Sequence, residues 1–338
     1  MSNRPPFKQA FTFDDVLLVP QRSSVLPRDV NLKTRLTKKI KLNIPILSAA
    51  MDTVTERDMA IALARTGGMG VIHKNLSIND QANMVDRVKR SESGMILNPI
   101  TVEESSTIKG AKMVMSEYKI SGLPVVKNDR LVGIITNRDI RFETNDMLTV
   151  SERMTSEDLV TVPVGTSLEK SKEILQKHRI EKLLVVDGDH NLTGLITVKD
   201  IQKNEDYPNA CKDSNGRLRV AAAIGVSGDA FERARELASV EIDAIVIDTA
   251  HGHSKGVLDT ISRIKNENQN VAVIAGNVAT GDGTKALIES GVDSVKVGIG
   301  AGASCTTRVI AGVGVPQLTA IMDAVDVARE FDIPIIAD

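Results

Sequence analysis

The chain has 338 residues, of which 42% are hydrophobic and 25% are charged, and its formal net charge is −2. This composition excludes a disordered or fibrous protein, and the length predicts two domains or one large domain with an insertion. A nearly neutral charge predicts no nucleic-acid partner and no attraction to anionic lipid. No apolar run reaches the roughly 18 residues of a membrane span and the first residues lack a secretory signal, so we expect a cytoplasmic protein.

Short apolar runs alternate with amphipathic stretches over most of the chain, which predicts parallel strands joined by helices. Seven strands, each followed by a polar or glycine-rich loop, favour an α/β fold of the (β/α)8 TIM-barrel type. The alternative is a doubly wound sheet, but no strand-linked G-x-G-x-x-G fingerprint supports it. The expected strands are Ile44–Met51, Met69–His73, Arg219–Ile224, Ala244–Asp248, Val271–Ala275, Ser294–Val297 and Ile333–Ala337.

Helices are expected between these strands. Thr53 and Glu56 have the spacing of a capping box and would open a helix that ends near Gly67. Further helical patterns cover Ser77–Arg90, Ala230–Ser239 and Ser254–Asn266.

An internal repeat interrupts this alternation between residues 92 and 207. The motif Gly-Ile-Ile-Thr-x-x-Asp at 133–139 returns as Gly-Leu-Ile-Thr-x-x-Asp at 194–200. This pair resembles a tandem of cystathionine-β-synthase-type (CBS) domains, which are α+β. We therefore divide the chain into a first barrel part at 1–91, CBS domains at about 92–150 and 151–207, and a second barrel part at 208–338.

Each repeat has a threonine at a strand end and an aspartate three residues later, namely Thr136 with Asp139 and Thr197 with Asp200. Such carboxylates can accept hydrogen bonds from ribose hydroxyls. In the alternative, structural interpretation each threonine caps a helix whose third residue is the aspartate, and both roles are compatible. The CBS resemblance implies regulatory binding of adenine or guanine nucleotides at these four residues, although some CBS domains only dimerise.

The carboxyl ends of the strands should carry the chemistry of a barrel. The most distinctive stretch there runs from Lys296 to Arg308 and contains Gly298, Gly300 and Gly302. Glycines permit positive φ angles and close backbone approach. Successive carbonyls or amides in such a loop can surround a cation or hold a phosphate.

The two cysteines are too few for a disulfide framework. Cys305 lies in the glycine-rich loop, flanked by Ser304, Thr306 and Thr307 and with Lys296 and Arg308 nearby in sequence, and these groups should favour a thiolate. We interpret Cys305 as a nucleophile and Cys211, in the segment that re-enters the barrel, as an inert thiol.

Six motifs of the chain can be compared with known families, and they are Phe13–Pro20, Leu47–Thr55, Ile72–Asn75, Asp248–Ser254, Ala275–Val278 and Cys305–Arg308. Together they resemble bacterial inosine-5′-monophosphate (IMP) dehydrogenases, and the resemblance spans residues 7 to 338. It implies a (β/α)8 barrel with an inserted CBS pair, and NAD-dependent oxidation of IMP with water to xanthosine monophosphate in guanine nucleotide synthesis. It also implies a homotetramer or octamer.

The resemblance also implies roles for individual residues. Cys305 would attack C2 of hypoxanthine, hydride would pass to nicotinamide, and water would hydrolyse the resulting thioimidate beside Thr307. The remaining roles are Asp248, Gly298, Ile299 and Gly300 for NAD; Ser48, Asn277, Ala303 and Asp338 for IMP; and the carbonyls of Gly300, Gly302 and Cys305 for K⁺.

Two departures from the family pattern matter. The loop Gly300-Ala-Gly-Ala-Ser-Cys305 stands where relatives have Gly-Pro-Gly-Ser-Ile-Cys. Ala303 cannot supply the hydroxyl that the resemblance implies for the 5′-phosphate, and Ser304 is the alternative donor. The sequence also ends at Asp338, before the eighth strand, phosphate loop, flap and water-activating arginine of the family, so we expect partial folding and no turnover by this chain alone.

Two other functions remain open. Guanosine monophosphate (GMP) reductase shares the barrel and the cysteine, but its loop normally continues Thr-Arg-Lys-Lys, whereas Val309 follows Arg308 here. A nucleotide-sensing or assembly module without turnover is the alternative from a different class, favoured by the CBS pair and the missing catalytic end.

Overall fold

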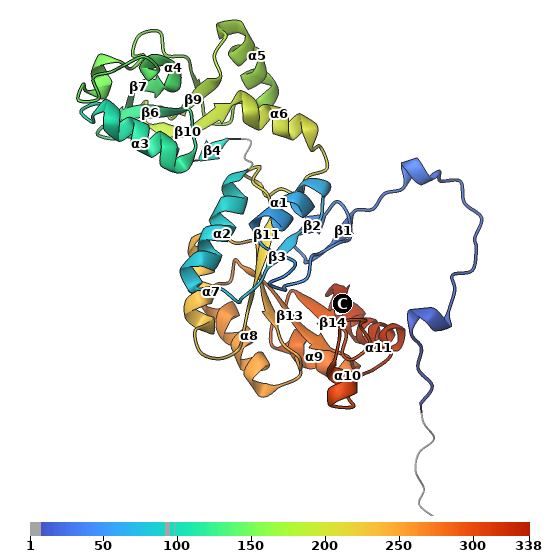
Figure 1. Ribbon diagram of the computed structural model, residues 1–338. Coiled ribbons are helices and arrows are strands. Elements are labelled where there is room, and N and C mark those ends of the chain that lie inside the picture. The colour runs from blue at the N-terminus through green and yellow to red at the C-terminus, as the bar shows by residue number, and fades with distance from the viewer. Residues whose placement is uncertain (1–7, 92–94, 98) are drawn as a thin grey trace, which may run out of the picture. The chain divides into compact units, whose positions relative to one another are not determined.

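The computed structural model describes residues 8–91, 95–97 and 99–338 (Figure 1). The chain forms two compact units. Unit 1 contains the residues up to Ser91, Asn209–Asp213 and Leu218–Asp338, and unit 2 contains Glu92–Pro208 and Ser214–Arg217. Of the helices in the described ranges, none is long and apolar enough to cross a membrane.

Unit 1 is built on a six-stranded parallel sheet whose spatial order is β15-β14-β13-β12-β11-β3. Each strand pairs in parallel with the next along the series, as consecutive β/α units require, with one shift of register between β13 and β14 after Gly276. Six of the seven predicted strands are thereby confirmed. Their bounds are β3 Gly70–Ile72, β11 Val220–Ile224, β12 Ala244–Asp248, β13 Ala272–Val278, β14 Ser294–Val297 and β15 Ile335–Ala337.

The predicted buried strand Ile44–Met51 is wrong. Only Leu47 forms a bridge there, parallel to Met69, and no residue of the segment is buried. Pro45 lacks a backbone donor, and the residues from Pro45 to Ala50 line a cavity. The fold is therefore a curled parallel half-barrel of six strands and one bridge, rather than the seven strands that the sequence predicts.

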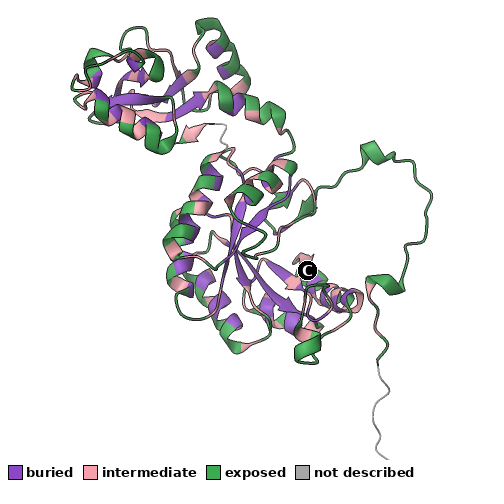
Figure 2. Ribbon diagram, in the orientation of Figure 1, coloured by how far each residue is buried: buried purple, intermediate pink, exposed green. Residues whose placement is uncertain are grey.

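Alternate residues of the strands fill the interior of this curl. Val71, Ala223, Val246 and Ile274 lie in one buried cluster, together with leucine and isoleucine side chains from the turn around β1 (Thr34–Arg35) and β2 (Lys41–Leu42). The intervening strand residues pack outward under the helices, so both faces are buried (Figure 2). This two-sided burial explains why the strands appear in the sequence as continuous apolar runs.

The helices of unit 1 follow the strands on the outside of the curl and turn their apolar faces inward (Figure 2). The predicted capping box of Thr53 and Glu56 is wrong, because α1 begins after Glu56, which makes no side-chain capping bond. Its end at Gly67, in the left-handed conformation, is confirmed. The helices are α1 Arg57–Thr66, α2 Ile78–Ser91, α7 Ala230–Ser239, α8 Lys255–Glu267, α9 Gly281–Glu289, α10 Thr307–Ile310 and α11 Gln317–Glu330, with short 3-10 turns at Phe13–Asp15 and Pro27–Asp29.

Unit 2 contains the internal repeat as two similar half-units, each strand–helix–strand–strand–helix. In both, the first strand is parallel and the third antiparallel to the second. The registers match, since Val102 pairs with Val125 and Val162 with Val185. The elements are β4 Ile96–Leu97, β5 Val102–Glu103, α3 Ile108–Tyr118, β6 Gly122–Lys127, β7 Arg130–Thr136, α4 Asn137–Ile140, the 3-10 turn Val150–Glu152, β8 Thr161–Pro163, α5 Leu168–His178, β9 Lys182–Val186, β10 Leu192–Thr197 and α6 Val198–Asp206.

Candidate active site

The carboxyl ends of β12 to β15 bring four polar side chains together. Lys296 Nζ, on β14, lies 3.0 Å from Asp248 Oδ1 at the end of β12 and 3.2 Å from Asp338 Oδ2 after β15. Asn277 Nδ2, on β13, donates to Asp338 Oδ2 at 2.6 Å. Three predicted site residues, Asp248, Asn277 and Asp338, thus belong to one cluster at the edge where barrel enzymes carry their chemistry.

The loop after β14 depends on glycine at two positions. Gly298 has φ +151° and Gly300 has φ +78°. A Cβ on Gly298 would lie 2.6 Å from Asp338 O, and a Cβ on Gly300 would lie 2.6 Å from Val313 O. Gly302 departs from our expectation, because its φ is not positive and an added Cβ would meet only Cys305 Cβ at 3.7 Å. Two glycines rather than three therefore shape the loop by their conformational freedom.

Cys305 is only partly buried and its pKa is lowered from the usual thiol value. The main cause is the hydroxyl of Thr307, which donates to the sulfur. The backbone N–H groups of Thr307 and Gly300 contribute in the same direction, while slight desolvation and the negative charge of Asp338 oppose them. Hydrogen bonds to the thiolate stabilise it, so this thiol is prepared for nucleophilic attack.

The expected reason for this reactivity is right for Thr307 and wrong for the two cations. Neither Lys296 nor Arg308 is among the causes of the lowered pKa of Cys305, and the ammonium of Lys296 instead contacts Asp248 and Asp338. Cys211 behaves as predicted. It is 2% exposed, and burial raises the pKa of its thiol to about 11.

A cavity of about 420 Å³ opens inside the curl beside the cluster. Ser48, Lys296 and Asp338 line it together with apolar side chains from the sheet interior. Ser48 Oγ accepts the backbone N–H of Val71 at 3.2 Å, which fixes its side chain near the end of β3. Mixed apolar walls with a few convergent polar groups are typical of small-molecule sites.

Gln317 is a residue of the site that the sequence analysis missed. Its side chain is buried, and Nε2 donates to Val297 O at 2.9 Å and to Asp338 O at 3.0 Å. The amide therefore holds the ends of β14 and β15 together. Among the described residues, Gln317 Oε1 and Asn277 Oδ1 are buried acceptors without a protein donor, and Asn277 Oδ1 fits a ligand N–H or O–H.

The backbone of the loop fits the expected monovalent cation. Gly302 O accepts the N–H of Cys305 at 3.1 Å, whereas the carbonyls of Gly300 and Cys305 accept no backbone hydrogen bond from any described residue. Carbonyl oxygens with unused lone pairs are suitable ligands for a hard cation. A metal site made of side chains would need at least three His, Cys, Asp or Glu residues close together. No such group occurs within the described ranges.

The other predicted loop residues have simpler surroundings. Ile299 is buried and its carbonyl accepts the N–H of Val315 at 3.1 Å, so only its backbone could serve a cofactor. Ala303 and Ser304 are both exposed. This exposure leaves Ser304 free to serve as the alternative phosphate donor.

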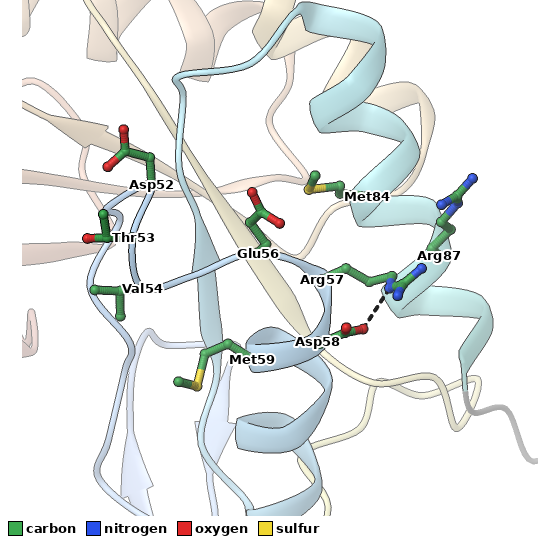
Figure 3. A pocket seen from close by; sticks show the side chains of 9 residues that line it. All are labelled: Asp52, Thr53, Val54, Glu56, Arg57, Asp58, Met59, Met84 and Arg87. Atoms are coloured by element: carbon green, nitrogen blue, oxygen red, sulfur yellow. Dashed lines mark hydrogen bonds and ion pairs between the residues drawn. The ribbon is translucent and has the colours of Figure 1, made fainter.

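A second cavity, of about 520 Å³, lies beside the N-terminal end of α1 (Figure 3). Glu56 points into it from the loop before α1, while Arg57 and Asp58 pair with each other at its rim (Figure 3). Glu56 Oε1 also lies 3.6 Å from the buried Nε2 of His73. This cavity shares no lining residue with the cavity at Lys296 within the described part of the chain.

The repeated motif of unit 2 forms capping boxes. Thr136 Oγ1 donates to Asp139 Oδ2 at 2.7 Å, and Thr197 Oγ1 donates to Asp200 Oδ2 at 2.5 Å. The backbone N–H of each threonine donates to the same carboxylate oxygen. The structural interpretation of these four residues is therefore confirmed, and ribose binding stays a prediction.

Cations from both repeats gather near this motif. Lys182 Nζ donates to Ser121 Oγ at 2.9 Å across the two repeats. The pKa of Lys182 is lowered mainly by burial, and the positive charges of Lys199 and Arg138 lower it further. The carboxylates of Glu181 and Asp139 act in the opposite direction. Unit 2 thus presents three basic side chains beside Asp139.

A model of the IMP dehydrogenase / GMP reductase domain matches residues 10–338. The chain belongs to this family. Inosine-5′-monophosphate dehydrogenase of Aquifex aeolicus is 59% identical over 334 residues, covering 98% of this chain and 68% of that protein. The enzyme of the same description from Bacillus subtilis is 56% identical over 334 residues with the same coverage. The family resemblance found in the sequence is thereby confirmed.

Solved structures of the family agree with the fold. GMP reductase from Trypanosoma brucei, in complex with guanosine 5′-triphosphate, has a TM-score of 0.87 at 38% identity and covers 98% of this chain and 81% of that chain. A cysteine-to-alanine variant of the same enzyme, in complex with guanosine 5′-monophosphate, has a TM-score of 0.88 at 38% identity and covers 98% of this chain and 72% of that chain. The two solved structures are GMP reductases at 38% identity, whereas the two relatives named above, at 59% and 56% identity, are IMP dehydrogenases.

Of the two residues whose observed contacts the sequence analysis missed, Lys296 and Gln317, one carries a signal in the sequence. Lys296 is a charged side chain inside the strand Ser294–Val297, and charge in a buried strand normally marks a partner or a function. Gln317 directly follows Pro316 at the start of a helix and carries no such signal. Its role depends on which carbonyls the fold places beside it.

Proposed function

We propose that the chain is an NAD-dependent IMP dehydrogenase that converts IMP, NAD⁺ and water into xanthosine monophosphate, NADH and a proton. The observation that carries the proposal is the lowered pKa of Cys305 beside the cluster of Asp248, Asn277, Lys296 and Asp338. Identity of 56–59% to IMP dehydrogenases over almost the whole chain supports it. The reaction belongs to guanine nucleotide synthesis.

Each step assigns a task to residues of this chain. The Cys305 thiolate, held by Thr307 and Gly300, forms a bond to C2 of the purine. NAD, when bound, accepts the hydride that leaves C2. The covalent thioimidate on Cys305 is then hydrolysed: water adds at C2, its proton is lost, and the thiolate departs as the leaving group. A thiolate that is stable at neutral pH favours both the attack and the departure.

The polar cluster would orient the two ligands. Asp338, held by Asn277 and Gln317, is assigned to the hydroxyls of the IMP ribose, and Ser48 lies in the same cavity. Asp248 is assigned to the nicotinamide ribose, with the backbone of Gly298 to Gly300 beside it. Ionised carboxylates accept hydrogen bonds and do not donate them, which suits a ribose diol. The K⁺ held by the carbonyls of Gly300, Gly302 and Cys305 would fix the loop.

Unit 2 is proposed as a regulatory CBS pair. Thr136, Asp139, Thr197 and Asp200 would bind the ribose of adenine or guanine nucleotides, and the three basic side chains Arg138, Lys182 and Lys199 would face the phosphates. The GTP bound to a structural neighbour supports a nucleotide site in proteins of this family. Exposed apolar residues in the N-terminal segment support an interface between copies of the chain. We propose that the assembly is a homotetramer or octamer and that the protein is cytoplasmic.

Enzyme assays test the proposed reaction. NADH formation is measured with IMP, NAD⁺ and K⁺, and NADPH consumption is measured in parallel with GMP. The sequence analysis expects no turnover by this chain alone, but Cys305 and the polar cluster are all present in it, and we therefore expect NADH to form. Cys305→Ala should abolish NADH formation, and Cys211→Ala should retain it because the buried thiol takes no part. Oxidation of NADPH with GMP instead would identify a reductase. Binding of nucleotides to unit 2 without either reaction would favour the sensing module.

Calorimetry with ATP tests the regulatory site. We expect Asp139→Ala combined with Asp200→Ala to weaken binding at least tenfold, because each lost charged acceptor removes a strong hydrogen bond. Glu152→Ala is the matched control, since it breaks another capping box of unit 2, formed with Thr149. Equal loss of affinity in both variants would show that the aspartates matter only for the helices.

A further inference from the structure

Lys296 stands between the two carboxylates to which the proposed function gives different ligands. Its Nζ lies 3.0 Å from Asp248 Oδ1 and 3.2 Å from Asp338 Oδ2. Two oxygens that contact one nitrogen at these distances are at most about 6 Å apart, so without the ammonium the two carboxylates would repel each other. The ammonium of Lys296 therefore holds both Asp248, which is assigned to the cofactor ribose, and Asp338, which is assigned to the substrate ribose.

The surroundings keep Lys296 in this place. Its side chain is 16% exposed, and Gly276 on the neighbouring strand lets the backbone of Lys296 approach closely, since a Cβ there would lie 2.5 Å from Lys296 O. Two other groups face the pair, and one of them, Asn277, donates to the same oxygen of Asp338 that Lys296 contacts. Lys74 Nζ donates to the backbone oxygen of Asp248 at 3.3 Å, and Asn277 Nδ2 is a neutral donor to Asp338.

The charged state of Lys296 follows from the same contacts. Burial alone lowers the pKa of a lysine, but the two carboxylates more than offset it, and the pKa of Lys296 is raised from its usual value. The ammonium is therefore present throughout the pH range in which the enzyme would work. A permanent cation can orient both carboxylates through charge-assisted hydrogen bonds.

We propose that Lys296 is a positioning residue shared by both ligand sites, which holds Asp248 for the cofactor ribose and Asp338 for the substrate ribose. This inference rests on the proposed function. It predicts that one substitution weakens the binding of two chemically different ligands at once. A residue that served only one site would affect only one ligand.

The experiment compares Lys296→Met, Lys296→Arg and the wild type. Dissociation constants for IMP and for NAD⁺ are measured separately, together with KM and kcat. We expect Lys296→Met to raise both dissociation constants and both KM values at least tenfold while kcat falls less than threefold. Lys296→Arg, which keeps the charge, should restore both ligands to within threefold of the wild type.

Two controls separate positioning from loss of structure. Lys265→Met removes a comparable lysine–aspartate pair, with Asp293 at 2.9 Å, at the opposite ends of the strands, and should leave both affinities unchanged. The alkylation rate of Cys305 should stay within twofold in Lys296→Met, because Lys296 does not contribute to the lowered pKa of that thiol. Lys296→Gln, which keeps a polar side chain, serves where the methionine variant does not fold, and should also weaken both ligands.

Each alternative result has a definite meaning. Weakening of only one ligand, or of neither, in folded Lys296→Met or Lys296→Gln overturns the inference while the proposed function stands. Failure of the wild type to bind IMP and NAD⁺ overturns the proposed function, and this inference with it.

Discussion

At the scale of single residues, the reactivity of Cys305 is set by a hydroxyl two positions along the chain. Thr307 is the largest cause of its lowered pKa, with two backbone N–H groups behind it. A thiolate reacts with alkylating agents and a thiol does not, so a lower pKa means faster alkylation at neutral pH. Thr307→Val keeps the shape and the backbone N–H but removes the hydroxyl, and we expect the pKa of Cys305 to rise toward the ordinary value.

The measurement is the rate of iodoacetamide alkylation as a function of pH. The rate in Thr307→Val should fall several-fold at neutral pH and equal the wild-type rate at pH values above both pKa values. Thr307→Ser retains a hydroxyl and should behave like the wild type. Cys211 is an internal control, because its pKa of about 11 and its burial make it unreactive under the same conditions. Identical pH profiles for the valine variant and the wild type would contradict the assignment.

The sequence could predict which residues lie at the site better than it could predict their partners. Asp248, Asn277 and Asp338 follow from it because polar residues at the ends of parallel strands must meet at one edge. Which group faces which is decided by side-chain directions and by close approaches such as Gly298 against Asp338 O. That is why the sequence assigns Lys296 to Cys305, whereas the structure places it between two carboxylates.

At the scale of elements, a buried ionic network ties α2 to the strands at the amino end of the sheet. Lys89, in the last turn of α2, lies 2.9 Å from Asp213 and 2.8 Å from Asp243, and all three side chains are less than 10% exposed. Arg219 adds a bond to Asp243 and donates to the carbonyl of Lys212. The network thus joins the end of α2, where the chain leaves unit 1, to the segment by which it returns.

Removal of Lys89 should therefore be costly. Lys89→Met leaves two buried carboxylates without the ammonium that they share, and breaking a buried ion pair in this way typically costs about 3–5 kcal/mol. We expect the free energy of unfolding of unit 1, measured by urea titration, to fall by about this amount. The exposed pair of Lys285 and Glu289 in α9 is the control, and Lys285→Met should cost less than about 0.5 kcal/mol. Similar losses in both variants would show that burial adds nothing at Lys89.

Elements with strong periodic patterns are predicted well by the sequence, and elements that depend on distant partners are not. The helix Ala230–Ser239 and the strand Ala244–Asp248 have the predicted bounds, because buried apolar runs and amphipathic faces are local properties. Ile44–Met51 has a similar apolar pattern, but a strand exists only where a neighbour pairs with it. Only Leu47 finds such a neighbour, at Met69.

At the scale of the whole molecule, the N-terminal segment before β1 exposes an unusual amount of apolar surface. Leu17 is 96%, Leu18 97% and Val19 75% exposed. The segment is nevertheless held at its start, where Phe11 and Thr319 of α11 exchange hydrogen bonds, and by the pairing of β1 with β2 at its other end. Apolar side chains that are this open to water are typical of protein interfaces.

We expect these leucines to be covered by a second copy of this chain in the proposed homo-oligomer. Leu18→Asp should shift the wild-type assembly toward smaller species in sedimentation velocity, because a buried unpaired carboxylate is strongly unfavourable at an interface. The thermal stability of the smaller species should change little, since Leu18 makes few contacts within its own chain. Ser24→Asp adds the same charge to an exposed polar position of the segment and should leave the assembly intact. An unchanged assembly in Leu18→Asp would mean that the oligomer uses another surface. Dissociation in both variants would attribute the effect to the added charge rather than to the lost apolar contact.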